Sequence, residues 1–430
     1  MLELKKIYTW LIVLYPILSI YSTGIPSLCV ADAVLLLFFV VALVKKRMKI
    51  EKFEMTKTFF IFLVYILFTM LIQMMFGNVS IFSSLRYLLF LLSIICLKDL
   101  FDFDSGTKLL GFITITVSIY VIVQYLCVHT IGITLPWRIP GLPIMDNSFI
   151  AKEQSSYYLV YYRPTGIFCE PTHYAQYCLV YPCYLLFADE SLLNKKKWIS
   201  IIIITCGIIC SGSAAGLLMI AGIFGFYYLK YVCKGQINVQ LIILAIFIIV
   251  GAFYVLKSPE LSKIVKKLIA EDGSNISVSV GYRFNSIVNL FNNRSILEII
   301  IGSGRGSQAE YYTAIFYVAY AHGVLGVLLF LNIFIQALHY YNTSFQKVTT
   351  WIVLLMAIGS EMVVNFGIMT YFVFILTYNT NSTQYTLQKD TLDMIDQENK
   401  HEEDCDNIVF LCARKYDWGC KNDKACKIFE

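Results

Sequence analysis

Residues 58–76 read TFFIFLVYILFTMLIQMMF and contain no charged side chain. A helix needs about 20 consecutive apolar residues to cross the hydrocarbon core of a bilayer, and within a helix the backbone polar groups bind one another. We therefore expect this stretch to cross a membrane as a helix. Similar apolar stretches recur along the chain. The twelve predicted spans are Ile7–Ser22, Leu28–Val44, Thr58–Phe76, Ser83–Leu97, Leu109–His129, Thr172–Phe187, Trp198–Cys210, Ser213–Leu229, Ile237–Leu256, Tyr311–Leu338, Thr350–Val364 and Phe366–Tyr378.

The composition supports the same class of protein. Of 430 residues, 58% are hydrophobic and 15% are charged, whereas soluble domains have about 45–50% apolar and about 25% charged residues. Eighteen of the 63 charged residues lie between Gln384 and Glu430, so the preceding 383 residues contain only 45. This excludes a soluble enzyme, a nucleic-acid-binding protein and a disulfide-rich secreted domain. We predict an all-α, polytopic integral membrane domain over residues 1–383 and a charged, flexible cytoplasmic tail over 384–430.

The basic residues orient the predicted spans. The connection between the second and third spans contains six basic residues, and such connections usually lie in the cytoplasm. Alternation along the chain then places both termini in the cytoplasm and leaves two long outer loops, about 130–171 and 257–310. The first apolar stretch lacks a small-residue cleavage site, so we expect it to remain as a membrane helix of the cytoplasmic (inner) membrane. The six basic residues are Lys45, Lys46, Arg47, Lys49, Lys52 and Lys57.

The densest polar cluster closes the first outer loop and reads RPTGIFCEPTH over residues 163–173. Pro171 suits the first turn of a helix, so Arg163, Glu170 and His173 should lie together at the membrane–water boundary. A carboxylate and an imidazole there could deprotonate a hydroxyl group, and the arginine could bind an anion through two hydrogen bonds. The alternative, which spacing alone favours, is a salt-bridged cluster that fixes the loop.

The second outer loop contains Arg283, Arg294 and Arg305, the last within GSGRG at residues 302–306. Glycine-rich backbone before a helix can bind phosphate oxygens, although a simple turn is the commoner meaning of such a pattern. Two outer loops that each place an arginine near the start of a helix indicate a shared external site for a polyanionic, membrane-tethered substrate.

Four ionisable residues lie inside the predicted spans, where charge is costly and often functional. Asp32 and Arg86 lie near outer helix ends and could form a structural pair with each other. His322 lies mid-helix and is more often a hydrogen-bonded packing residue than a catalyst. Glu361 could form a helix–helix hydrogen bond. The outer loops contain no cluster of metal-ligating residues, so we expect neither a metal nor another cofactor.

Four motifs resemble bacterial polysaccharide polymerases of the O-antigen polymerase (Wzy) type, in a superfamily shared with O-antigen ligases. The segment 163–175 is similar to the family's R-x-x-G-x-F-x-E-P segment, and SGSAAG at 211–216 is similar to its small-residue break between helices. IGSGRG at 301–306 and YAHGVLGVLLF at 320–330 resemble its second glycine turn and the following helix. Ligases typically present a histidine early in that helix, and here Glu310-Tyr-Tyr-Thr has none, which favours a polymerase.

The resemblance implies a membrane glycosyltransferase with a fold like that of the glycosyltransferase-C enzymes, acting on the outer face of the cytoplasmic membrane. Its substrates would be oligosaccharide repeat units on undecaprenyl diphosphate, and its partners a flippase and a chain-length regulator. We expect Glu170 or His173 to activate the acceptor hydroxyl and Arg163 and Arg305 to bind diphosphate, supported by the other two loop arginines. The alternatives are a ligase that transfers finished glycan and a flippase or other transporter.

Overall fold

The computed structural model describes residues 2–45, 47, 55–75, 81–145, 162–188, 195–233, 235, 294–304 and 312–378. Within these ranges the chain is mostly helical, and the described residues contain no β-strand but only two isolated bridges. The predicted all-α class is therefore confirmed for this part of the chain. The predicted span Ile237–Leu256, the tail 384–430, Arg283 and Arg305 lie outside the described residues.

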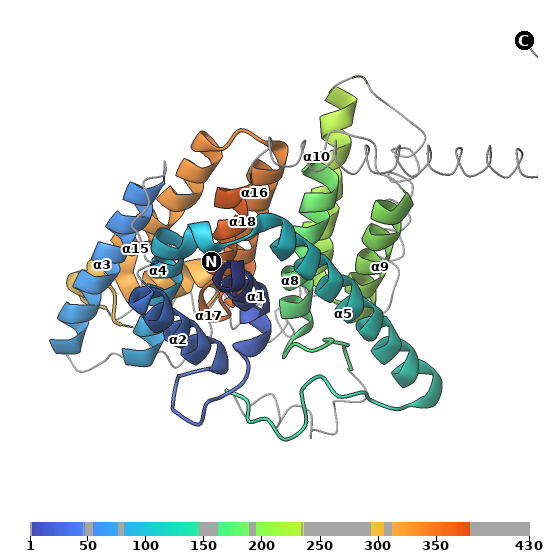
Figure 1. Cartoon of the computed structure of the whole chain (residues 1–430), viewed down its shortest axis with the longest axis horizontal. Helices are drawn as coiled ribbons and strands as arrows, with labels where there is room; N and C mark the ends of the chain where they lie inside the picture. The colour runs from blue at the N-terminus through green and yellow to red at the C-terminus, as the bar shows by residue number, and fades with distance from the viewer. Residues whose placement is uncertain are drawn as a thin grey trace, which may run out of the picture. The chain divides into compact units, whose positions relative to one another are not determined.

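The order of the helices along the chain can be followed in Figure 1. In the first part of the chain they are α1 (Leu2–Leu18), α2 (Val30–Val44), α3 (Thr56–Met75), α4 (Ile81–Leu97), the 3₁₀ turn η1 (Lys98–Leu100), α5 (Phe103–Ile131), α8 (Pro171–Phe187), α9 (Lys195–Ser211) and α10 (Ala214–Cys233). The second part contains α14 (Ile296–Ile301), α15 (Ala314–Tyr340), α16 (Ser344–Gly359), α17 (Met362–Asn365), the 3₁₀ turn η2 (Ile368–Tyr371) and α18 (Phe372–Thr377).

Five helices of the described part are long and apolar enough to cross a membrane: α3, α4 together with η1, α5, α10 and α15. Three further apolar segments, α2, α16 and residues 368–377, are shorter than a full span. The chain is thus a membrane protein by the length and composition of its helices, whereas the total of twelve spans stays a prediction.

The first predicted span ends earlier than expected. The sequence predicts a helix to Ser22, but α1 ends at Leu18 and the backbone of Tyr21 forms an antiparallel bridge with Ile144. The Ser22 amide donates to Pro143 at 2.9 Å. The Ile20 carbonyl likewise accepts from the Met145 amide at 2.9 Å. The helix does not continue through these residues, because their backbone groups bind a segment far along the chain.

Two predicted helices are broken. In α15 the backbone leaves helical geometry at Gly323, whose φ is +68°. The predicted span over residues 350–364 is interrupted at Ser360, between α16 and α17. The predicted division near residue 366 is confirmed, because Gly367 has a φ of +77° and a Cβ there would collide with the Tyr15 ring.

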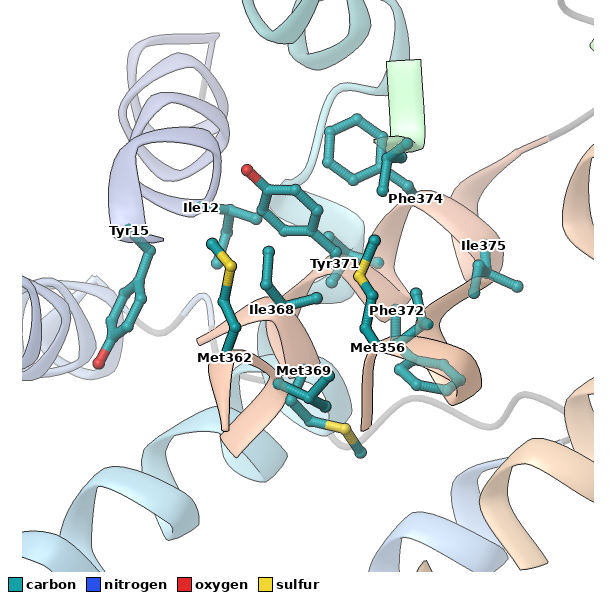
Figure 2. Close-up of a cluster of buried hydrophobic side chains, with 14 of the residues drawn as sticks. Ile12, Tyr15, Met356, Met362, Ile368, Met369, Tyr371, Phe372, Phe374 and Ile375 are labelled. Atoms are coloured by element: carbon teal, nitrogen blue, oxygen red, sulfur yellow. The ribbon is translucent and has the colours of Figure 1, made fainter. Parts of the chain in front are cut away.

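The main core contains residues from nearly all the described helices, and the part drawn in Figure 2 gathers side chains of α1, α16, α17, η2 and α18. Met356, Met362 and Tyr371 are fully buried there, since flexible thioethers and aromatic rings fill irregular gaps between broken helices. The hydroxyl of Tyr371 donates to the Val13 carbonyl at 3.1 Å, so its polar atom is satisfied. Figure 2 shows the hydroxyl of Tyr15 turned away from this cluster.

A second, smaller core joins the connections at one end of the helices. Ile20, Tyr21, Trp137 and Ile144 are buried together, with Cys169 and Phe366 packed against them. We call this end the loop end and define it by segments 19–29, 132–145 and 162–170, which lie along the lower edge of Figure 1. The helices α8 and α10 both begin at the loop end, where the hydroxyl oxygens of Thr172 and Ser213 lie 3.4 Å apart.

Candidate functional site

The loop before α8 is fixed by a glycine turn. Gly166 has a φ of +66°, and a Cβ there would collide with the Val117 and Val121 side chains of α5. The Gln124 amide of α5 binds both backbone groups of Gly166: its Nε2 donates to the carbonyl at 3.1 Å and its Oε1 accepts from the amide at 2.9 Å. A buried glutamine that is matched in this way holds the turn in one conformation.

Packing explains most of the remaining motif residues. Phe168 is 1% exposed and lies with its ring centroid 5.0 Å from that of Tyr177. Pro171 occupies the first turn of α8, where its missing amide hydrogen costs nothing. The half-buried Glu170 precedes it as the N-cap residue and does not cap the helix with its side chain. Packing alone thus accounts for the glycine, phenylalanine and proline, and it leaves the arginine and glutamate of the motif for other roles.

Arg163 reaches the connection between α9 and α10. Its Nη2 donates to the Gly212 carbonyl at 2.6 Å, while the side chain as a whole keeps contact with solvent. Nearby protein atoms displace water from the guanidinium and lower its pKa, and the negative charge of Glu170 partly opposes this effect. An arginine remains protonated at neutral pH in spite of such a shift. Thr172 and Ser213 lie beside this contact, with their hydroxyl oxygens 3.4 Å apart.

His173 is almost fully buried one residue further into α8, 1% exposed. Its ring lies 4.4 Å from that of Phe366, measured between centroids. The sequence predicts this histidine at the membrane–water boundary beside Glu170, and the structure places it in the first turn of α8 but beneath the surface. A proton acceptor that contacts solvent directly is therefore better supplied by Glu170, which is half-buried.

Glu361 and Arg86 both contact Asn365, the last residue of α17. The Asn365 side chain donates to Glu361 at 2.7 Å, and the Asn365 carbonyl lies 3.5 Å from Nη1 of Arg86. Glu361 therefore accepts a hydrogen bond within its own segment, and a hydrogen bond between two helices stays a prediction.

The predicted pair of Asp32 and Arg86 is confirmed. Nε and Nη2 of Arg86 both donate to Asp32 Oδ2, at 2.9 and 2.8 Å, and the two side chains are 12% and 1% exposed. The carboxylate also accepts from the hydroxyl of Tyr15 and from the Cys29 amide at 3.2 Å. Every charge in this network is matched by hydrogen bonds, as a buried ion pair requires.

Arg294 belongs to a different cluster, built on α14 and α15. Its guanidinium carbon lies 4.4 Å above the ring of Tyr320, a cation–π arrangement, and Tyr312 stacks on Tyr320 at 5.3 Å between centroids. The two clusters are thus held by separate helices: Arg163 by α8, α9 and α10, and Arg294 by α14 and α15.

The glycine turn after α14 contacts the break in α15 through backbone alone. A Cβ on Gly302 would collide with the backbone of Ala321, and a Cβ on Gly323 would collide with that of Ile300. Both glycines have positive φ angles, +82° and +68°. Only glycine permits two backbones to approach this closely.

Two polar residues of α3 join this turn to the break. Nε2 of Gln73 donates to the carbonyls of Ile301 and Ala321, at 3.0 and 2.7 Å. The Tyr65 hydroxyl donates its one hydrogen between the carbonyls of His322 and Ile300, which lie 2.8 and 3.2 Å from its oxygen. The carbonyl groups that the break frees from helical pairing are thereby satisfied, as the interior of a membrane protein requires. His322 lies at this break and not in a continuous helix, and its Nδ1 is 2.9 Å from the Thr69 hydroxyl. The predicted packing role of His322 is supported.

Sequence reasoning missed Gln73, Gln124, Tyr15 and Tyr65. A signal for the two glutamines was present, since an uncharged amide in an apolar span must find partners and both bind backbone groups of distant loops. Tyrosines are common in this chain, so their type alone did not distinguish these two. Among the described residues, no group of three or more histidine, cysteine, aspartate and glutamate side chains is placed to hold a metal ion.

The site therefore joins Arg163, Glu170, Thr172 and Ser213 at the loop end, and the Asp32–Arg86 network and the Arg294 cluster are separate units. Neither protein-family models nor curated proteins show a match to this chain.

Proposed function

We propose that the protein is a membrane glycosyltransferase that polymerises lipid-linked oligosaccharide repeat units into surface polysaccharide. The loop end would face the outside of the cytoplasmic membrane, with both termini in the cytoplasm. The donor and acceptor would be repeat units on undecaprenyl diphosphate, supplied by a flippase and limited in length by a chain-length regulator. The assignment rests on the four sequence motifs together with the geometry of the loop end.

One observation gives the strongest support: Gly166, Phe168 and Pro171 fix the loop so that Arg163 and Glu170 lie together beside the start of α8. A cation and a carboxylate held by rigid neighbours at the end of a membrane helix suit a substrate whose charged diphosphate lies at the headgroup level. The N-terminal ends of α8 and α10 add partial positive charge at the same place.

The proposed reaction forms a bond between the acceptor hydroxyl oxygen and the anomeric carbon of the donor sugar, and it breaks the bond from that carbon to the diphosphate. Glu170 accepts the hydroxyl proton, or His173 does so if a movement of Phe366 opens it to substrate. Arg163 stabilises the charge that develops on the departing lipid diphosphate, and Arg305 is proposed for the same task from its place in the sequence. Arg283 and Arg294 would support the binding of diphosphate.

The test uses the purified chain in liposomes with lipid-linked repeat units. A polymerase gives a ladder of products that differ by one repeat unit, whereas a complete absence of longer products with authentic substrate contradicts the proposal. Gene deletion separates the two transferase alternatives, because loss of a polymerase leaves single repeat units on the acceptor and loss of a ligase leaves long unattached chains.

A transporter of lipid-linked oligosaccharide is the second candidate. The break of α15 at Gly323 favours it, because discontinuous helices with freed carbonyls line substrate sites in many transporters. In this chain Tyr65 and Gln73 already bind those carbonyls. Movement of a fluorescent lipid-linked sugar across liposomes, without any change in its length, would support this candidate.

A further inference from the structure

A buried polar cluster lies one turn beneath the proposed catalytic residues, where α8, the start of α15 and the end of α16 meet. Its members Gln176, Ser360 and Thr313 are 0%, 1% and 7% exposed. The Ser360 hydroxyl donates to the Gln176 side chain at 2.5 Å, and the Ser360 carbonyl accepts from the Ala314 amide at 2.8 Å. Ser360 thus joins the middle of α8 to the first turn of α15.

Two polar atoms of this cluster have no hydrogen-bond partner among the described residues: Nε2 of Gln176 and Oγ1 of Thr313. Burial of a polar atom without a partner costs about 1–3 kcal/mol, so a fold retains such atoms rarely and often for function. Thr313 is also the N-cap residue of α15, a position where a threonine hydroxyl normally binds an amide of the first turn, and here it does not.

We propose that Gln176 and Thr313 form a subsite for a hydroxyl group of a neutral sugar. A hydroxyl donates and accepts at once, so it matches a threonine hydroxyl and either end of a side-chain amide. The subsite rests on the proposed function, in which it would hold the acceptor sugar, because Gln176 lies on the same face of α8 as His173, three residues further along.

The charges around the cluster favour a neutral ligand over an acidic sugar. The three residues are uncharged, and Glu361 follows Ser360 directly in the chain with its carboxylate bound to Asn365. A carboxylate of the ligand would be buried near the like charge of Glu361, whereas the guanidinium of Arg163 binds the Gly212 carbonyl. Phe366, half-buried beside His173, supplies an apolar ring of the kind on which sugar faces pack.

Two variants test the subsite. Thr313→Val keeps the shape of the side chain and removes a hydroxyl that makes no hydrogen bond within the described structure, so the variant should be as stable as the parent or more so. Gln176→Leu removes the amide and with it the bond to Ser360. Gln336→Leu is the matched control, since Gln336 is a half-buried glutamine that binds Asn332 near the opposite end of α15.

Saturation-transfer NMR on the detergent-purified chain measures binding without requiring turnover, with methyl glucoside, N-acetylglucosamine and glucuronate as probes. We expect signals from at least one neutral sugar and none from glucuronate, with the signals lost in Thr313→Val and Gln176→Leu and kept in the control. In the polymerisation assay both variants should raise the KM for the lipid-linked repeat units about tenfold, which corresponds to the loss of one hydrogen bond, and leave kcat within about twofold.

Unchanged sugar signals in folded Thr313→Val overturn the subsite, as does binding of glucuronate at the same residues or loss of signal in the control. A ladder from wild-type protein with no effect of either variant rejects the subsite and leaves the polymerase intact. Sugar binding that depends on both residues, with no ladder, supports the subsite and rejects the polymerase.

Discussion

Removal of the negative charge in the buried network should destabilise the protein strongly. Asp32→Asn keeps the size of the side chain and an oxygen for the Cys29 amide, but it leaves Arg86 buried opposite a neutral group. Breaking one partner of a buried pair costs about 3–5 kcal/mol, because the other charge remains without compensation. The Tyr15 hydroxyl also loses a charged acceptor, which contributes about 1.5–3 kcal/mol of that cost.

The assay is denaturant unfolding in detergent micelles, with the midpoint compared between variants. Asp99→Asn is the control, because Asp99 is 57% exposed and pairs with Lys98 at the surface, where removal of one charge costs less than about 1 kcal/mol. The double variant Asp32→Asn, Arg86→Gln should be more stable than the sum of its single changes predicts, by about 0.5–3 kcal/mol. Strict additivity, or an Asp32→Asn midpoint no lower than that of the control, would refute a paired network.

Two further predictions concern the second glycine turn and the helix before it. Gly302→Ala should cost about 2–5 kcal/mol in the same unfolding assay, through backbone strain plus a clash with Ala321. The control Gly24→Ala has a similar φ but no atom near the added methyl, so it should cost about 1–2 kcal/mol. Equal losses in the two variants would exclude the clash. Hydrogen bonds from Ser295 lower the pKa of Glu298, so Ser295→Ala should raise that pKa in an NMR titration. The ionised carboxylate adds stability above its unfolded pKa and loses it as pH falls, and this contribution should be smaller in the variant. An unchanged titration curve would contradict the prediction.

The apolar helices and several local features could be predicted from sequence, because each depends on residues close together in the chain. The stretch at 58–75 lies within α3, and Pro171 marks the start of α8 as its type predicts. The pair of Asp32 and Arg86 could be proposed as well, because few charges lie in apolar spans and each must find an opposite one.

The helix breaks and the roles of the glutamines could not be predicted, because they depend on contacts between distant segments. Gly323 permits a break only because α14 lies against it, and residue type does not reveal which of the 24 glycines has such a neighbour. The early end of α1 likewise follows from the pairing of Tyr21 with Ile144, more than a hundred residues away.

The measurement that tests the central claim most directly is the chain-length distribution made by Arg163→Lys in liposomes with lipid-linked repeat units. Lysine keeps the charge and a donor for the Gly212 carbonyl but loses the planar fork that binds a diphosphate through two hydrogen bonds. We expect a polymerisation rate about 10- to 100-fold lower, with Arg47→Lys, an exposed arginine on the predicted cytoplasmic connection, at the wild-type rate. Wild-type ladders from Arg163→Lys would contradict the assignment of this arginine to the lipid diphosphate.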